Sequence, residues 1–361
     1  MAKPSPSHVK GRGAQSSALS LRLGKTERET DGDWRDYMQA LGGPPVKLRT
    51  TVVEERPRTI LTYNQSPDIR FDRSINPYRG CEHGCVYCYA RPTHAYHDHS
   101  PGLDFETRLY AKPEAGPMLR AALAHPGYRP RPIALGTNTD PYQPIEATYR
   151  ITRSILEVCL ETKHPVTITT KSDRVLADMD LLSNLAAQRL VAVAISVTSL
   201  DPILSSKLEP RASSPAKRLI AIGKLVEAGI PVHCSVSPVI PAITDEFMES
   251  IIEEAARMRV NSIGWLALRL PHEVAPLFRE WLAVHYPDRA AKVMGIVRSI
   301  RGGRDNDPGF HTRFNPSGVW ADLFRARFRS ACRKAGIGKA RFELDCSRFR
   351  APEADSQLRL L

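Results

Sequence analysis

From Ile69 onward, short apolar runs of strand length alternate with longer segments in which apolar residues recur at helical spacing. This alternation is typical of βα units, whose parallel strands form a sheet that helices cover. The predicted strands are residues 71–76, 132–136, 165–170, 190–197, 231–236 and 262–267. Helical patterns occupy residues 148–162, 175–187, 215–228 and 245–258, and continue after the last strand as far as residue 300. Six βα repeats predict an α/β fold, an open or partial (β/α) barrel over residues 69–271.

The segments on either side of this region lack its rhythm. Residues 1–30 are rich in Ser, Gly, Lys and Arg with little apolar periodicity, so we expect a disordered basic tail. Residues 31–68 predict an N-terminal extension strapped across the barrel. It contains one helical and two extended candidates, at residues 34–41, 47–53 and 59–63. Residues 272–361 are predicted to form a helical, basic C-terminal section.

Polar residues gather where the predicted strands end. The second strand leads into G-T-N-T-D-P-Y-Q-P-I-E at 136–146, the third into T-K-S at 170–172, and the fourth and fifth into Ser196 and Ser235. In (β/α) barrels, the loops that carry chemistry converge at this end of the strands. We expect part of these residues to line a site, whereas others, such as Asp201, are explained equally well as helix caps.

The composition is that of an ordinary globular domain, with 42% hydrophobic and 25% charged residues. No apolar run reaches the ~18 residues of a membrane-spanning helix, and the N-terminus lacks the apolar core of a signal peptide. The odd total of seven cysteines, without a secretory leader, favours a reducing compartment over a set of disulfides. We therefore expect a cytoplasmic protein without a membrane partner.

The net charge of +12 is concentrated at the two ends of the chain. Residues 1–25 carry five Lys or Arg and no acid, and residues 289–350 carry fifteen Lys or Arg against five Asp or Glu. Within the second stretch, residues 315–336 predict an amphipathic helix. Its inward candidates are Val319, Leu323, Phe328 and Ala331, and its outward ones are Arg325, Arg327, Arg329, Arg333 and Lys334. Such a face suits the phosphates of a nucleic acid, and a merely solvated basic surface is the alternative.

The segment N-P-Y-R-G-C-E-H-G-C-V-Y-C-Y-A holds Cys81, Cys85 and Cys88 at C-x3-C-x2-C spacing. Three thiolates can bind three irons of a cubane cluster and leave the fourth iron without a protein ligand, open to chemistry. The alternative is a structural zinc ion completed by a nearby imidazole, although zinc sites usually draw their ligands from two paired halves. The candidate imidazoles are His83, His94, His97 and His99, of which the last three are expected in a solvated loop.

The cysteine triplet, with Tyr87 before its last member, resembles the signature of the radical S-adenosylmethionine (SAM) superfamily. With T-D-P-Y-Q-P-I-E, T-K-S and the S-P after the fifth strand, it resembles the branch related to spore photoproduct lyase, labelled DNA-repair-photolyase-like. The resemblance implies a partial (β/α)6 TIM-like radical SAM barrel with a [4Fe–4S] cluster on Cys81, Cys85 and Cys88, and SAM on the open iron. It implies reductive cleavage of SAM to a 5′-deoxyadenosyl radical that abstracts hydrogen from a substrate. A reductant such as flavodoxin or ferredoxin would supply the electron.

The resemblance also implies which residues contact SAM at the barrel mouth. Tyr87 would lie near the adenine, and Thr139 and Asp140 near the methionine end. A compact ammonium at Lys171 would neutralise the carboxylate of SAM. The ribose would contact two serines at the ends of strands, Ser196 and Ser235.

One departure concerns the segment after the second strand. Spore photoproduct lyase resembles a thiol-assisted enzyme that carries a hydrogen-donating cysteine on this segment. Residues 132–150 contain no cysteine here, and Thr137 or Thr139 stands in that region. We therefore expect a substrate other than spore photoproduct.

The remaining cysteines add no second cluster. Cys159 falls in a predicted helix and is expected in the core. Cys234 is expected to be a buried small side chain, with a redox role inside the barrel as the alternative. Cys332 and Cys346 have no C-x2-C partner.

Two classes of function follow from these patterns. The first is a radical SAM enzyme, and we expect nucleic acid as its class of substrate. The alternative is a nucleic-acid-binding protein whose three cysteines hold a structural metal. The βα repeats and polar strand ends favour the enzyme, because a structural metal needs no barrel mouth around it.

Overall fold

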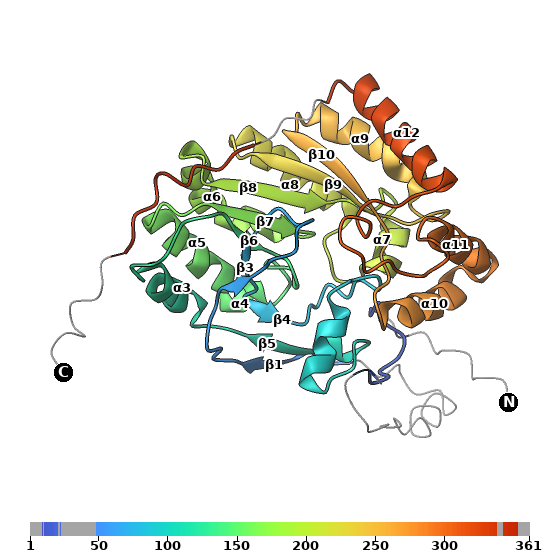
Figure 1. The fold of residues 1–361 in the computed structure, drawn as a ribbon, viewed down its shortest axis with the longest axis horizontal. Helices are drawn as coiled ribbons and strands as arrows, with labels where there is room; N and C mark the ends of the chain where they lie inside the picture. The colour runs from blue at the N-terminus through green and yellow to red at the C-terminus, as the bar shows by residue number, and fades with distance from the viewer. Residues whose placement is uncertain (1–8, 10, 21, 23–47, 338–341, 353–361) are drawn as a thin grey trace.

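The computed structural model describes residues 9, 11–20, 22, 48–337 and 342–352. Its main sheet has seven strands in the order β10-β9-β8-β7-β6-β3-β2 (Figure 1). Six are parallel: β3 (Arg73–Ile75), β6 (Ile133–Leu135), β7 (Val166–Thr170), β8 (Val191–Ser196), β9 (Val232–Val239) and β10 (Ser262–Ala267). The edge strand β2 (Thr62–Tyr63) runs antiparallel to β3. All six predicted strands are confirmed, and because β10 and β2 are free edges the barrel is open, as predicted.

Four helices cover the outer face of this sheet (Figure 1). They are α5 (Ile151–Glu161), α6 (Met179–Ala187), α8 (Pro215–Glu227) and α9 (Met248–Arg257). The helices predicted between the strands are therefore confirmed, with shorter bounds. A separate short element precedes three of them: α4 (Glu146–Tyr149) before α5, η2 (Asp173–Asp178) before α6 and η3 (Asp245–Phe247) before α9. The α/β class and the partial barrel are both confirmed.

Side chains alternate between the two faces of each strand, as the pleat requires. On the helix side, positions such as Val193, Ile195 and Val232 are fully or almost fully buried. The concave side instead carries small or polar residues at Thr167, Thr169, Ala192, Ala194, Ser196, His233, Ser235, Ser237, Ser262 and Gly264. Closed barrels fill this space with bulky branched residues. Here Thr169, in the middle of the sheet, is exposed, so the inside of the barrel is open to solvent.

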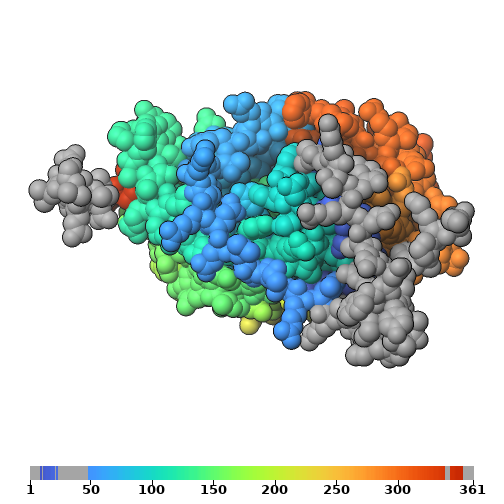
Figure 2. Space-filling view, turned by 90° about the horizontal axis from the view of Figure 1, so that it is seen from below, coloured from blue at the N-terminus to red at the C-terminus, as the bar shows by residue number. Residues whose placement is uncertain are grey.

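A second, three-stranded sheet lies below the barrel and consists of β1 (Thr51–Glu54), β5 (Arg108–Ala111) and β4 (Tyr78–Arg79). The helical elements η1 (Arg91–His97) and α2 (Asp104–Thr107) lie beside it, while α3 (Ala115–Leu123), which follows β5, packs against α5 (Figure 1). The N-terminal extension contributes β1 to this sheet and β2 to the main sheet, at its two predicted extended segments. Figure 2 shows the extension, in blue, beside the teal residues of the second sheet. The predicted helix at 34–41 lies outside the described residues.

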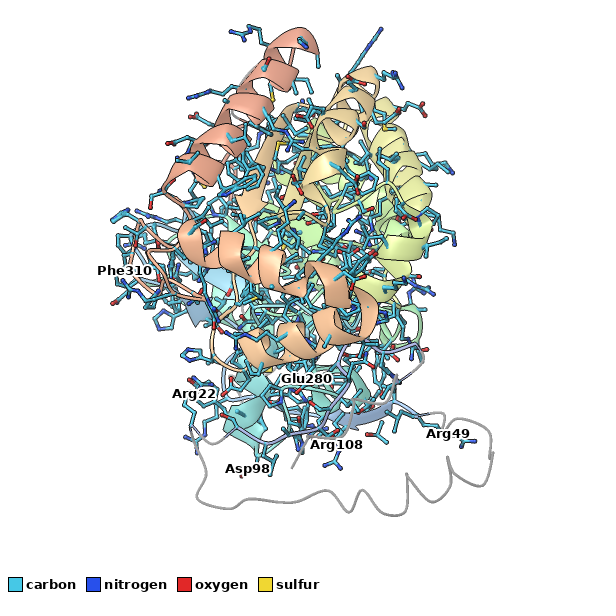
Figure 3. All side chains as sticks on the ribbon, turned by 90° about the vertical axis from the view of Figure 1, so that its right-hand side faces the viewer. Arg22, Arg49, Asp98, Arg108, Glu280 and Phe310 are labelled. Atoms are coloured by element: carbon cyan, nitrogen blue, oxygen red, sulfur yellow. The ribbon has the colours of Figure 1, made fainter. Side chains whose placement is uncertain are left out.

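The prediction of a disordered tail over residues 1–30 is wrong for residues 11–20. Ala14 is fully buried, and the hydroxyl of Ser16 donates to Glu280 at 2.8 Å. Arg22 forms an ion pair with Glu273 at 3.2 Å; Arg22 and Glu280 are labelled in Figure 3. This polar, glycine-containing segment is ordered because its amides and side chains bind buried or half-buried carboxylates, a stabilisation that apolar periodicity does not reveal.

The C-terminal section is helical, with α7 (Pro202–Leu208) before it and α10 (Val274–His285), α11 (Pro287–Ser299) and α12 (Val319–Lys334) within it. In the described part of the chain, no helix is both long and apolar enough to span a membrane.

The predicted helix at 315–336 is α12, and its inward face is as predicted at Phe328 and Ala331 but differs in the first half of the helix. Val319 and Leu323 are 85% and 44% exposed, whereas Ala321 and Phe324 are buried. Phe324 packs edge-on against Trp265 of β10 with 6.3 Å between ring centroids. Arg327, predicted to face solvent, pairs with Asp245 and Glu249 at the start of α9. The prediction is right for Phe328 and Ala331 and wrong for Val319, Leu323 and Arg327, because tertiary contacts, rather than the hydropathy of the helix itself, select the buried stripe.

The first prediction concerns the docking of α12. Phe324→Ala should lower the free energy of unfolding by about 3 to 5 kcal/mol, since it leaves a cavity beside Trp265. Leu323→Ala, on the exposed face, should change it by less than about 0.5 kcal/mol. Urea unfolding followed by tryptophan fluorescence measures both variants. Equal losses for the two would contradict this orientation of α12.

Candidate active site

The three cysteines of the C-x3-C-x2-C motif lie in one loop between β4 and η1. Cys81 and Cys85 are buried, Cys88 is partly exposed, and none of them forms a disulfide. Cys88 packs against two apolar clusters, one containing Cys85 and the other containing Cys81. Burial raises the pKa of the Cys81 and Cys85 thiols, so a metal that binds them as thiolates must displace their protons.

The buried guanidinium of Arg91 holds this loop in shape. Its Nε donates to the carbonyl of Cys85 at 2.9 Å, and its Nη2 donates to the carbonyl of Gly84 at 3.1 Å. Nη1 donates to two further carbonyls in the turn that precedes α2. Arg91 also pairs with Glu106 at 2.5 Å, and both side chains are 0% exposed. The charge of this ion pair is therefore balanced within the protein.

Glu106 binds the N-terminal segment as well. Its carboxylate accepts the amides of Gly13 and Ala14 at 3.1 and 2.8 Å. A Cβ atom at Gly13 would lie 1.8 Å from the carbonyl oxygen of Gly84, so only glycine fits there. Residues 11–16 thus form one wall of the cysteine loop.

The cysteine loop is also joined to other parts of the barrel through its backbone. The amide of Cys81 donates to the carbonyl of Phe105 at 2.8 Å, and that of Val86 donates to Leu208 at 3.1 Å. Gln143 accepts the amide of Glu82 at 2.9 Å. These bonds leave the loop little freedom, which suits a ligand set that must keep one geometry.

Asp140 ties the loops after β6 and β7 to the cysteine loop. Its carboxylate accepts the hydroxyl of Thr170 and the amide of Lys171, both at 2.7 Å, and the amide of Tyr142 at 2.9 Å. The Nδ1 atom of His83 lies 3.3 Å away. Burial acts to raise the pKa of Asp140, but His83 and the other donors outweigh it and lower the pKa to about 2.

Tyr87 lies over a second buried ion pair. Its hydroxyl donates to Glu209, which is paired with Arg218, and the side chains of both charged residues are at most 1% exposed. Lys171 Nζ lies 5.9 Å from the centroid of the Tyr87 ring. Burial acts to raise the pKa of Glu209, but Arg218 and then Lys171 lower it overall, so the carboxylate stays charged.

The other predicted SAM contacts lie at the same end of the barrel. Ser196 and Ser235 are register partners on β8 and β9, and the hydroxyl of Ser235 lies 2.9 Å from that of Ser237. Thr139 is buried and its hydroxyl donates to the carbonyl of Tyr78 at 3.4 Å. The structure brings Tyr87, Asp140 and Lys171 into contact, whereas Thr139 turns towards β4. The SAM-binding roles of these residues stay predictions.

The expectation of a solvated loop at the three histidines after the motif is wrong. His94 is 1% exposed, and its Nε2 lies 2.9 Å from the carbonyl oxygen of Arg108. The His99 ring stacks on Tyr110, with Nε2 2.7 Å from the tyrosine hydroxyl. Burial lowers the pKa of His94 to about 4. The histidines are structural here because the second sheet, which the sequence pattern did not reveal, covers them.

No group of three His, Cys, Asp or Glu side chains among the described residues converges on a point that could hold one metal ion. A zinc ion would require sulfur and nitrogen ligands within about 2.3 Å of a single centre. The other cysteines lie elsewhere: Cys159 and Cys234 are buried in the main core, and Cys332 packs at its edge. Cys234 is on the helix side of β9, so it does not line the inside of the barrel.

Sequence analysis missed the ion pairs that support the site. Arg91 directly follows the motif, but its partner Glu106 lies fifteen residues on, and Glu209 and Arg218 belong to no recognisable motif. No sequence signal identifies such partners, because a buried charge is distinguished from a surface charge only by the segments that cover it.

Residues 75–255, about half of the chain, match the family described as the radical SAM superfamily. An uncharacterised protein of Mycobacterium tuberculosis is 35% identical over 230 residues, covering 63% of this chain and 68% of the relative. An uncharacterised protein of Methanocaldococcus jannaschii is 28% identical over 215 residues, covering 59% and 76%. A structure of spore photoproduct lyase complexed with dinucleoside spore photoproduct is similar with a TM-score of 0.56. It is 14% identical and the match covers 84% of this chain and 91% of that one.

The chain belongs to the radical SAM superfamily, and its fold is similar to that of spore photoproduct lyase. It is a radical SAM enzyme, a class that uses SAM and an iron–sulfur cluster. The predicted resemblance, the fold class and the prediction of an enzyme are confirmed. The alternative of a binding protein built around a structural metal is set aside.

The second prediction tests the Arg91–Glu106 pair. Arg91→Met should lower the free energy of unfolding by about 3 to 5 kcal/mol, because it leaves the Glu106 carboxylate buried without its partner. Arg120→Met breaks the pair with Glu161, whose side chains are 49% and 42% exposed, and should cost less than about 1 kcal/mol. Urea unfolding measures both, and a small loss for Arg91→Met would show that the pair is not structural.

The third prediction concerns pH and Glu146, which follows the T-D-P-Y-Q motif. Its carboxylate accepts a hydrogen bond from the Tyr78 hydroxyl and another, at 2.9 Å, from the Thr152 amide. Burial raises the pKa of Glu146 to about 7. The folded state therefore keeps a proton that the unfolded chain releases near pH 4.5. This contribution to stability is complete below about pH 4.5 and is lost as the pH rises through about 7.

Glu146→Gln removes the titration while keeping the shape of the side chain. The free energy of unfolding of the variant minus that of wild type should therefore rise with pH. Its value at about pH 8 should exceed its value at about pH 4 by about 2 to 3 kcal/mol. Urea unfolding of both proteins at the two pH values measures this difference. A difference that does not change with pH would contradict the raised pKa.

Proposed function

We propose that this enzyme binds a [4Fe–4S] cluster through Cys81, Cys85 and Cys88, cleaves SAM reductively, and acts on a nucleic acid. The observation that carries the proposal is the arrangement of three free thiols in one braced loop beside the polar end of an open barrel. Three thiolates suit three irons of a cubane and leave one iron for SAM. The set fits a cluster better than one zinc ion, which needs four ligands around one centre.

When bound, the cluster and SAM would supply a 5′-deoxyadenosyl radical for hydrogen abstraction. The chain itself supplies position and charge. The Arg91 guanidinium holds the carbonyls of Gly84 and Cys85, so the thiols keep one spacing. Burial of Cys81 and Cys85 keeps water away from two of the three sulfurs.

Lys171 is the cation that we assign to the carboxylate of SAM. Its amide is held by Asp140, and its Nζ lies over Tyr87, which places the ammonium beside the cysteine loop. Glu209 is close to Tyr87 but shares its charge with Arg218, and Asp140 is occupied by four donors. Neither carboxylate forms an ion pair with Lys171, so its charge is available to a ligand.

The proposed substrate class rests on the basic character of the chain and on its fold. The spore photoproduct lyase structure of similar fold holds a dinucleoside photoproduct, a property of that protein. In this chain the loop after β6 has Thr137 and Thr139 and no cysteine between residues 132 and 150. A thiol from this loop therefore cannot return hydrogen to the product, which supports a nucleic-acid substrate other than spore photoproduct. A flavodoxin or ferredoxin is the proposed electron donor.

The fourth prediction tests this chemistry. Wild-type protein, reconstituted with iron and sulfide without oxygen, should form 5′-deoxyadenosine from SAM when reduced. Cys85→Ala should bind less iron and form no product, because it removes one of three cluster ligands. Cys159→Ala removes a buried thiol of the core and should retain iron and product formation. Stoichiometric zinc in the wild type, with no iron–sulfur absorbance after reconstitution, would refute the proposal.

A further inference from the structure

A cavity of about 480 Å³ lies beside the cysteine loop, on the side of the N-terminal extension. Four parts of the chain line it: the segment between β1 and β2, the ends of β3 and β4 with neighbouring η1, the residue after β5, and the loop after β6. The residues that carry the argument are Glu55, Arg56, Arg58, Asn76, Arg79 and Lys112. None of the three cysteines lines it, whereas Thr139, a predicted SAM contact, does.

The charges around this cavity are unbalanced. Arg79 forms a two-point pair with Glu55, at 2.6 and 2.7 Å, which uses the acidic side chain of the lining. Arg56 and Arg58 are exposed, and neither has a hydrogen-bond or ion-pair partner among the described residues. Lys112 is 8% exposed, and its Nζ donates to the carbonyl of Asn76 at 2.9 Å. Four cations therefore face one carboxylate.

The excess of positive charge around the cavity affects the pKa of Lys112. Burial and then the charge of Arg79 lower its pKa to about 8, although Glu55 partly opposes them. A buried ammonium in positive surroundings is stabilised when an anion enters. The cavity thus has the charge, the volume and the donors for an anionic group.

A single layer of hydrogen-bonded residues separates the cavity from the cysteine loop. Tyr89, next to the last cysteine, donates its hydroxyl to the carbonyl of Thr137. The hydroxyl of Thr137 and the amide of Asn138 donate to the side chain of Asn76 at 3.2 and 2.9 Å. Asn76 in turn accepts from Lys112. An anion beside Lys112 would therefore sit one residue layer from the loop that holds the thiols.

From these contacts we infer that the cavity binds backbone phosphates of a single nucleic-acid strand and so positions a neighbouring nucleotide at the barrel mouth. This inference rests on the proposed function, since it names how that substrate is held. Arg56 and Arg58 lie two residues apart in an irregular, proline-containing segment between β1 and β2, a spacing that can follow successive phosphates. The side-chain amide of Asn138 adds an uncharged donor to the lining, whereas that of Asn76 already donates to the hydroxyl of Thr137 at 3.1 Å.

The basic helix α12 is a poor alternative for this role. It packs over α9, on the opposite side of the main sheet from β1 and β5 (Figure 1). Arg327 is already paired with Asp245 and Glu249, while Arg329 and Arg333 are exposed on the outer surface. Charges there cannot orient a substrate at the cysteine loop, which makes Arg329 and Arg333 matched controls.

The fifth prediction is a binding measurement on the full, cluster-loaded protein. Fluorescence anisotropy of a labelled single-stranded DNA of about 12 nucleotides gives the dissociation constant over a range of salt concentrations. The double variant Arg56→Gln/Arg58→Gln should bind about tenfold more weakly. It should also reduce the slope of log K against log salt by about 1.4, since two phosphate contacts are lost. Arg329→Gln/Arg333→Gln should bind within about twofold of wild type.

A second variant and two competitors define the site further. Lys112→Met should weaken binding in the same direction, with iron content and circular dichroism spectrum showing that the protein is folded. Unlabelled RNA of the same sequence tests which nucleic acid is preferred. Inorganic phosphate tests whether a free anion occupies the cavity. Displacement of the labelled DNA by an unlabelled strand but not by phosphate supports the inference. Equal displacement by millimolar phosphate opposes it.

The outcomes separate the two proposals. If wild type forms no 5′-deoxyadenosine from SAM, the proposed function fails whatever the binding data show. If wild type forms it, but Arg56→Gln/Arg58→Gln binds DNA as tightly as the α12 control, the assignment of the cavity is overturned. The same holds if the α12 control loses as much affinity as the cavity variant, because binding would then follow the total charge.

Discussion

The buried ion pair between Arg91 and Glu106 is the interaction on which the site depends. Removing two charges from water is costly, and attraction between them repays this only when their remaining hydrogen-bonding groups are satisfied. Here the guanidinium donates to carbonyls of the cysteine loop, and the carboxylate accepts amides of Gly13 and Ala14. The N-terminal segment, the motif and α2 therefore share one network, and the spacing of the thiols depends on segments far from it in sequence.

A similar logic governs the mouth of the barrel. Glu209 is paired with Arg218, and Asp140 is surrounded by His83 and three other donors, so the acidic groups near the cysteines are already satisfied. The ammonium of Lys171 forms no ion pair with either of these carboxylates. The surroundings thus remove negative charge from the side where we propose that SAM and a nucleic-acid substrate bind, and the residues on the concave face are small.

The order of strands and helices could be predicted because period-two and period-3.6 patterns are local properties of the chain. All six parallel strands and the four helices that cover the main sheet were found in this way, whereas α2, α3 and α7 were not. The same reasoning failed for the first half of α12, whose buried stripe includes Phe324 rather than Leu323, and for His94, which the second sheet covers. In both cases the deciding contact comes from a segment distant in sequence, Trp265 for the helix and Phe105 and Tyr110 for the histidine.

The sequence by itself determined the class of the protein, because the local motif around Cys81, Cys85 and Cys88 resembles the radical SAM signature and the family match over residues 75–255 confirms the class. It also determined the barrel, through repeated local patterns. Only the tertiary structure decided which charges are buried, how residues 11–20 brace the cysteine loop, and that Arg56, Arg58 and Lys112 surround one cavity. The physical reason is that burial and electrostatic coupling depend on distances between segments, and those distances exist only after the chain has folded.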